Sequence, residues 1–301
     1  MNIFKANLLL LLTAAIWGLA FVAQRVGMEH VGPFAFNGVR FMLGSLSLLP
    51  LLFYFRLDSQ DMKKRLQKPL LPGLLAGLVL FTAASLQQIG IITTTAGKAA
   101  FITSLYIVLV PLVGIFLRHR IGRWTWMGCI LAVVGLYLLC IKGALSIQSG
   151  DLLVLIGAFF WTLHILVIGY YSVRVDVLKL ASIQFLTCSL LSMGVALIFE
   201  PIVLSSLWAA AVPILYGGIC SVGIAYTLQV VGQKYAPPAH AAIILSLEAV
   251  FAVIGGFLLL GEHMDTREIT GCLLMLSGML VSQLQGLSQP GVIKDSVPEQ
   301  A

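Results

Sequence analysis

The sequence predicts an all-α integral membrane protein with ten transmembrane helices, arranged as two inverted five-helix repeats. Of its 301 residues, 59% are hydrophobic and only 10% are charged, and the mean hydropathy is +1.02. A water-soluble chain of this length does not bury so large an apolar fraction. Two further observations support the prediction: the apolar residues fall into runs long enough to cross a bilayer, and the two halves of the chain read as copies.

A helix that spans a bilayer needs about 20 mostly apolar residues, and ten such runs follow one another. They lie near 6–27, 34–55, 70–91, 97–117, 123–142, 151–171, 178–199, 210–232, 238–260 and 267–286. The first run is too long for a signal peptide, and no small-residue cleavage site precedes the second run, so we expect it to be a true helix. Pro237 and Pro238 separate the eighth run from the ninth. Residues 287–301 are expected to form a cytoplasmic tail.

Positive charges are concentrated on one side of the expected membrane. Thirteen of the 18 Lys and Arg residues lie on the side of the N-terminus: Lys5, Arg56, Lys63, Lys64, Arg65, Lys68, Arg118, Arg120, Arg123, Arg174, Lys179, Lys234 and Lys294. The opposite side has Arg25, Lys98, Lys142 and Arg267. Because cytoplasmic loops carry an excess of Lys and Arg, both termini are expected in the cytoplasm. This distribution accounts for the net charge of +6 without a nucleic-acid partner.

Matching residues recur at offsets between 142 and 144 along the chain. The pairs are Trp17 and Trp161, Arg40-Phe41 and Gln184-Phe185, Leu86-Gln87 and Leu228-Gln229, Ser104-Leu105-Tyr106 and Ser246-Leu247-Glu248, and Gly128-Cys129 and Gly271-Cys272. The first repeat is predicted over 1–142 and the second over 151–286. A unit of five helices forces the second copy to enter the membrane upside down, as in many secondary transporters. The loop charges agree, because the loop after the second run is rich in Lys and Arg whereas its counterpart has only Glu200.

Several of these residues resemble a known family. The segment Ala15-Ile16-Trp17-Gly18, the pair Arg40-Phe41 and the string from Ser246 to Glu262 are similar to the EamA branch of the drug/metabolite transporter superfamily. The resemblance implies a ten-helix carrier with two EamA units that moves small metabolites or drugs, in many members outward. Two departures are visible. Ala249 stands where many relatives have a helix-kinking Pro, and His119 is the counterpart of Glu262.

Glu248 is the costliest residue in the expected membrane. At a helical rise of about 1.5 Å per residue, it lies on the order of 15 Å from either surface. An ionised carboxylate at that depth costs roughly 3 kcal/mol on insertion scales. Glu248 therefore faces a wet cavity or is protonated, and it could exchange protons or hold a cationic amine depending on the conformation. The alternative is a structural acid hydrogen-bonded to a neighbouring helix.

Three aromatic residues share the depth of Glu248. Tyr106 is its repeat counterpart, and Trp17 and Trp161 occupy the middles of the first and sixth runs. Together with Glu248 they are candidates for one central substrate cavity, because aromatic walls and one acid suit an amphipathic organic solute. Simple helix packing is the alternative for each Trp. His164 lies one turn from Trp161 and is a second-rank candidate on the same face, unless it only hydrogen-bonds within the bundle.

Arg40 lies about 9 Å inside the outer end of the second run. Its side chain either snorkels to the outer headgroups or points inward to an anionic group, and the family resemblance favours the inward direction. Gln87, Gln88 and Lys98 are near the same outer level, whereas Gln184, Gln229 and His240 are near the inner one. Two polar layers that flank a central site are what two gates need.

Catalysis finds little support, because the sequence has no Gly-x-Ser-x-Gly, no phosphate loop and no Cys-x-x-Cys. The five cysteines are dispersed, so neither disulfides, metal nor a cofactor is expected. We predict a secondary transporter of the inner or plasma membrane that exports amino acids or similar amphipathic solutes by alternating access, with protons as a candidate coupling ion. A multidrug or cation efflux carrier, a non-transporting membrane scaffold and a lipid-modifying enzyme are the alternatives. A monomer and a homodimer both remain open.

Overall fold

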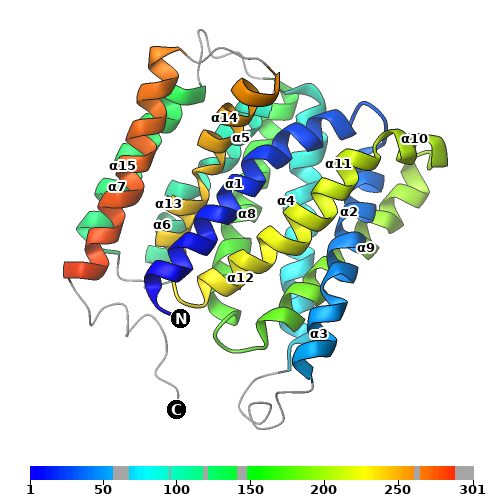
Figure 1. Cartoon of the computed structure of the whole chain (residues 1–301), viewed down its shortest axis with the longest axis horizontal. Helices are drawn as coiled ribbons and strands as arrows, with labels where there is room; N and C mark the ends of the chain where they lie inside the picture. The colour runs from blue at the N-terminus through cyan, green and yellow to red at the C-terminus, as the bar shows by residue number, and fades with distance from the viewer. Residues whose placement is uncertain (57–67, 95, 118–120, 141–147, 261–264, 289–301) are drawn as a thin grey trace.

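The computed structural model describes residues 1–56, 68–94, 96–117, 121–140, 148–260 and 265–288, and every regular element within these ranges is a helix (Figure 1). Eight of the described helices are long and apolar enough to cross a membrane. A ninth apolar helix, Arg123–Leu138, is shorter. The all-helical membrane architecture is therefore confirmed, while the count of ten spanning helices stays a prediction.

The first half of the chain forms seven helices. They are α1 (Ile3–Gly27), α2 (Pro33–Ser47), α3 (Leu49–Arg56), α4 (Leu70–Thr93), α5 (Ala96–Ser104), α6 (Tyr106–Phe116) and α7 (Arg123–Cys140). The helix α1 begins where the side chain of Asn2 accepts a hydrogen bond from the backbone N–H of Lys5, a common N-cap arrangement. Pro33 occupies the first position of α2, where its missing N–H costs nothing.

The second half forms α8 (Ser149–Tyr171), α9 (Val177–Phe199), α10 (Leu204–Ala209), α11 (Ala211–Leu215), η2 (Tyr216–Tyr226), α12 (Thr227–Gln233), α13 (Pro238–Leu245), α14 (Glu248–Leu260) and α15 (Thr266–Ser288). The start of α1 and the end of α15 lie at the same end of the bundle (Figure 1). The elements α11, η2 and α12 follow one another as a single span, Ala211–Gln233. Its centre is a π-helix of 11 residues. This form is rare in proteins, and where it occurs it is often at a functional site.

Two spans are interrupted at positions that are equivalent in the sequence repeat. Leu105 separates α5 from α6, and the pair Ser246-Leu247 separates α13 from α14. At both places the backbone tightens to i−3 hydrogen bonds, from Leu105 N to Ile102 O and from Leu247 N to Ile244 O. Although Ala249 lacks the proline of many relatives, the helix is broken just before it. A short tight turn therefore supplies the break without a proline at this position.

Apolar side chains cover the outside of the bundle and polar ones are enclosed. The exposed large residues include Leu12, Phe53, Leu71, Phe116 and Leu197, which suit contact with lipid chains. Buried polar residues are found on most of the helices, among them Asn37, Arg40, Gln88, His164 and Glu248. Because hydrocarbon cannot hydrate polar groups, their enclosure is expected of a membrane protein with a functional interior.

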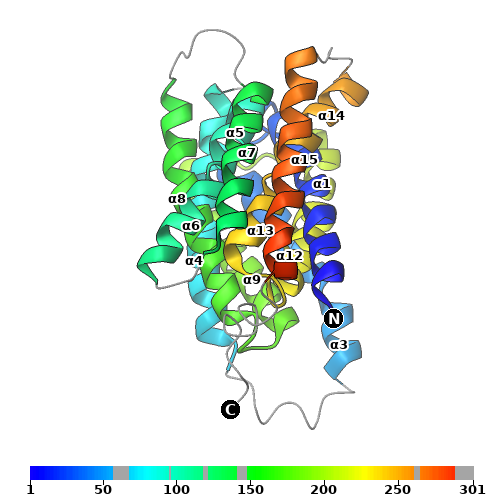
Figure 2. The ribbon, with the colours of Figure 1, turned by 90° about the vertical axis from the view of Figure 1, so that its left-hand side faces the viewer.

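Helix contacts in the described residues relate the two halves as a two-fold rotation would. The helix α7 packs along α15, and Figure 2 shows these two side by side. The helix α8 is the repeat counterpart of α1, and η2 with α12 is the counterpart of α4. Accordingly, α4 packs on α8, and α1 packs on η2 and α12. The helix α2 packs on its own counterpart, α9. The interrupted spans also meet each other, α5 against α14 and α6 against α13. The residues beside both helix breaks therefore face each other at the centre of the bundle.

Candidate substrate site

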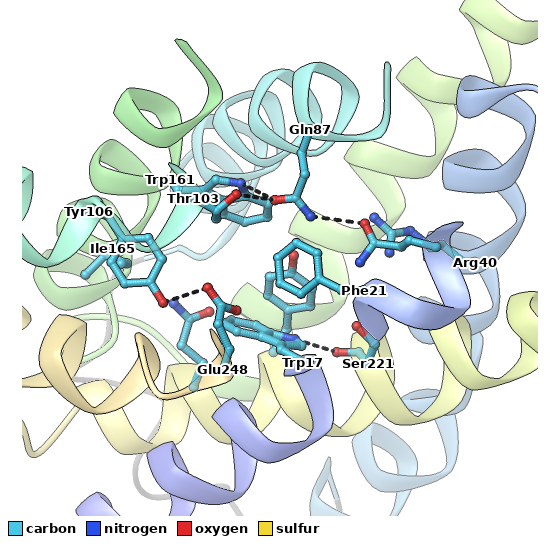
Figure 3. A pocket seen from close by; sticks show the side chains of 13 residues that line it. Trp17, Phe21, Arg40, Gln87, Thr103, Tyr106, Trp161, Ile165, Ser221 and Glu248 are labelled. Atoms are coloured by element: carbon cyan, nitrogen blue, oxygen red, sulfur yellow. Dashed lines mark hydrogen bonds between the residues drawn. The ribbon is translucent and has the colours of Figure 1, made fainter. Parts of the chain in front are cut away.

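A cavity lies within the bundle (Figure 3). Its walls come from α1, α2, α4, α5, α6, α8, η2, α12 and α14. The lining residues are Trp17, Phe21, Gln24, Arg40, Gln87, Thr103, Tyr106, Trp161, Ile165, Ser221, Tyr226, Gln229 and Glu248. Most of the cavity wall is aromatic or amide-bearing, and it contains one acid and one arginine.

Glu248 and Tyr106 are hydrogen-bonded to each other in this wall. The Tyr106 hydroxyl donates to Glu248 Oε1 at 3.0 Å, and each residue is the first of its helix after a break. Glu248 is 4% exposed, so its carboxyl group is enclosed. The helix breaks place both side chains in the cavity wall, and the contact joins the two repeats at equivalent positions. The arrangement provides an acid that can accept a proton or an ammonium group beside a hydroxyl donor.

Aromatic rings form the middle of the cavity wall, and Tyr226 lies at their centre. Its ring centroid is 4.5 Å from that of Trp17 and 6.1 Å from that of Trp161, with which it stacks at 21°. The Phe41 and Phe185 rings lie behind it at 6.0 and 5.9 Å. Such centroid separations are typical of favourable aromatic pairs, which hold the wall rigid.

Hydrogen bonds fix the orientation of the polar wall residues. Trp161 Nε1 donates to Gln87 Oε1 at 2.8 Å, and Gln87 Nε2 donates to Gln24 Oε1 at 3.0 Å. Thr103 Oγ1 donates to the same Gln87 oxygen at 3.4 Å. On the facing wall Trp17 Nε1 donates to the backbone oxygen of Ser221 at 3.3 Å. Both tryptophans thus present their ring faces within a fixed network.

Arg40 lines the cavity and does not reach the surface. Its side chain is 2% exposed, with its guanidinium carbon 5.4 Å from the Phe36 ring centroid and 4.9 Å from that of Phe41. Nε donates to Asn37 Oδ1 at 2.9 Å. The inward alternative therefore describes this structure, and the snorkelling alternative does not.

His164 lies behind the cavity wall. It is fully buried, its Nε2 pairs with Gln184 Oε1 at 2.9 Å, and its ring meets those of Trp161 and Tyr226 edge-on. It therefore supports the aromatic wall in this conformation, where a solute in the cavity has no direct access to it.

The six gate candidates are dispersed. Gln87 and Gln229 line the cavity, whereas Gln88 is fully buried with its Nε2 3.4 Å from Gln24 O. His240 lies between α1 and α15, with contacts of 3.2 Å to both Asn7 and Ser282. Gln184 is held by His164 as above. Lys98 lies in α5, and its side chain falls outside the described part of the structure.

Several lining residues were missed by the sequence analysis. Phe21 and Gln24 follow Trp17 by four and seven residues, which places all three on one helix face. Tyr226 precedes Gln229 by three residues and is a mid-span aromatic, so the same reasoning on helical spacing could have found it. Ser221 contributes through its backbone, which side-chain chemistry does not signal.

No group of three His, Cys, Asp or Glu side chains among the described residues lies close enough together to hold a metal ion. Cys129, Cys188, Cys220 and Cys272 are free.

A helical bundle with lipid-facing apolar residues, an internal two-fold relation and an enclosed polar cavity defines a multi-pass membrane transporter. The EamA-like transporter family matches residues 4–141 and again 148–283. The chain therefore belongs to the EamA-like transporter family and contains two of its domains.

Curated relatives and a solved structure agree with this assignment. An uncharacterized transporter of Archaeoglobus fulgidus is 31% identical over 93% of this chain and 86% of its own length. A probable amino-acid metabolite efflux pump of Salmonella typhimurium is 24% identical over 92% of this chain and 94% of its own. One crystal structure shares the fold with a TM-score of 0.78 at 18% identity, covering 96% of this chain and 99% of that one.

Proposed function

We propose that this protein is a secondary transporter that exports amino acids or similar amphipathic solutes across the inner (plasma) membrane by alternating access. The observation that carries the proposal is the Tyr106–Glu248 hydrogen bond in the wall of an aromatic cavity, where both helix breaks meet. The relative described as a probable amino-acid metabolite efflux pump supports the same substrate class.

The cavity fits an amphipathic solute in the chemistry of its lining residues. The rings of Trp17, Trp161 and Tyr226 offer apolar contact, while Glu248 and Arg40 offer opposite charges. An amino acid with an apolar side chain complements all three features. Its side chain suits the rings, its ammonium group suits Glu248, and its carboxylate suits Arg40.

Alternating access is supported by buried polar atoms at the end of the bundle that contains the start of α1. Among the described residues His164 Nδ1, Gln184 Nε2, Gln229 Oε1 and Gln233 Oε1 have no hydrogen-bond partner toward this end, and Gln88 Oε1 has none toward the opposite end. Buried groups of this kind normally find partners. We expect water or substrate to reach them when this end opens, which makes Gln184 and Gln229 inner gate residues. From the charge distribution we expect this end to lie in the cytoplasm, with both termini.

Protons are the coupling ion that Glu248 suits best. The same carboxylate cannot hold a proton and a substrate ammonium group at once, so binding one releases the other. Such competition couples proton entry to substrate exit in an exporter. A cation efflux carrier is the second candidate function, because aromatic rings with one acid also bind organic cations.

Proteoliposomes that contain the purified protein test the proposal directly. We expect labelled amino acids with apolar side chains to exchange across the membrane faster than in empty liposomes, and an imposed proton gradient to drive them uphill. Overexpression should also raise resistance of cells to toxic amino acid analogues. Exchange of cationic drugs alone, with no amino acid moved, would reject the proposed substrate class in favour of the second candidate.

A further inference from the structure

Arg40 is a buried cation that has no anionic partner among the residues that the structure describes. Within the described residues its only hydrogen bond is from Nε to Asn37 Oδ1, at 2.9 Å. No carboxylate oxygen in the same part of the chain lies within 4.0 Å of its nitrogens. Arg40 is one of the residues that line the cavity, and its two terminal nitrogens donate no hydrogen bond to a described residue. Since a guanidinium keeps its charge in proteins and a buried unpaired charge is strongly unfavourable, an anion from outside the chain is expected there.

The guanidinium is held in one orientation by its neighbours. Asn37 accepts from Arg40 and donates from Nδ2 to Ala84 O at 3.3 Å, which ties the pair to α4. The rings of Phe36 and Phe41 flank the guanidinium. On the η2 side, a Cβ atom added at Gly217 would lie 3.3 Å from Arg40 Cδ, so the absence of a side chain there leaves room for Arg40. A fixed planar fork of donors matches a carboxylate in two parallel hydrogen bonds.

Glu248 does not supply the missing anion in this conformation. Its Oε1 accepts from Tyr106, and Figure 3 shows Glu248 and Arg40 on different sides of Phe21. The cavity therefore has a cationic and an anionic region that are separated by aromatic side chains.

We propose that Arg40 forms a carboxylate subsite, so that this transporter takes solutes which combine a carboxylate with an apolar body and rejects organic cations that lack a carboxylate. Asn37 is its positioning residue. The inference rests on the proposed function only in that the cavity is the transport site. The carboxylate lies at Arg40, the apolar body lies among the rings, and Glu248 is left for an amine or a proton.

Three probes with one apolar body separate these groups. L-phenylalanine carries a carboxylate and an amine, L-phenylalaninamide lacks the carboxylate, and 3-phenylpropionate lacks the amine. Binding to the purified full chain is measured by tryptophan fluorescence, because Trp17 and Trp161 line the cavity. We expect at least one carboxylate probe to bind at least tenfold more tightly than L-phenylalaninamide, which corresponds to about 1.4 kcal/mol.

Two variants and one control assign the preference to Arg40. Arg40→Gln should weaken the carboxylate probes at least tenfold and change the amide less than about twofold. Asn37→Asp keeps Arg40 but places an anion beside it, so the preference for carboxylate should fall even if Arg40→Gln does not fold. Arg25→Gln is the matched control: Arg25 is exposed and donates to Ile91 O and Ile92 O outside the cavity wall, so the preference should persist.

The outcomes separate this inference from the proposed function. Binding of 3-phenylpropionate that depends on Arg40, without binding of L-phenylalanine, supports the subsite and rejects amino acids as substrates. Tightest binding of L-phenylalaninamide, or binding of neither carboxylate, overturns the subsite. Equal loss of carboxylate and amide probes in both variants also overturns it, because Arg40 would then be a structural cation.

Discussion

Replacing Glu248 by Gln tests the proposed mechanism most directly, because it removes the titratable charge and keeps the shape. A glutamine oxygen can still accept the Tyr106 hydroxyl, which now lies 3.0 Å from Glu248 Oε1. The folding free energy should therefore change by about 1 kcal/mol or less, the net value of one neutral hydrogen bond. Transport should fall much more, because Gln cannot offer a charged oxygen to a substrate ammonium group. A hydrogen bond to a charged group contributes about 1.5–3 kcal/mol, so its loss should lower the transport rate about 10- to 100-fold.

The assay is transport in proteoliposomes between pH 5 and 8, normalised to folded protein. Wild-type transport should vary with pH because the acid binds and releases protons, whereas transport by Glu248→Gln should be low and nearly flat. Glu29→Gln is the matched control, because Glu29 is exposed at the end of α1, and both rate and pH profile should remain. If Glu248→Gln instead lowers abundance or thermal stability while each folded molecule transports normally with the wild-type pH profile, Glu248 is structural and the reasoning is refuted.

Three further predictions follow from the described contacts. Tyr106→Phe leaves Glu248 without its hydroxyl donor, so the carboxylate should lose about 1–3 kcal/mol of stabilisation. We therefore expect the pH profile of transport to be displaced toward higher pH. An unchanged profile would count against a role for the Tyr106–Glu248 pair. Gly18→Ala places a Cβ 2.6 Å from Glu248 O and from Phe251 Cβ, so overpacking should lower the free energy of unfolding by about 1–3 kcal/mol, measured by thermal unfolding. Gly194→Ala is the control, since nothing lies within 4 Å of that Cβ. Equal losses of stability in the two variants would contradict the tight α1–α14 contact. Cysteines added at either terminus should resist a membrane-impermeant thiol reagent in intact cells, whereas one in the 143–150 loop should react, and labelling of a terminus would reverse the assigned orientation.

The sequence alone was sufficient for the class and for the depth of the central residues. Hydropathy follows from composition, and depth follows from counting residues at a fixed helical rise. The repeat offset then paired Tyr106 with Glu248 and Trp17 with Trp161, and the structure places all four in the wall of one cavity. These inferences need no knowledge of which way a helix is turned.

Rotation about each helix axis was decided only by the tertiary structure. A spanning helix is apolar toward lipid and largely apolar toward its neighbours, so its hydrophobic pattern barely distinguishes one face from another. That is why His164 was placed with Trp161 although it lies behind the wall, and why Tyr226 was missed although five rings meet it. The snorkelling and inward alternatives for Arg40 differ by the same rotation. Packing against α4 and η2 decided between them, because Asn37 and Gly217 accommodate Arg40 on the inner face.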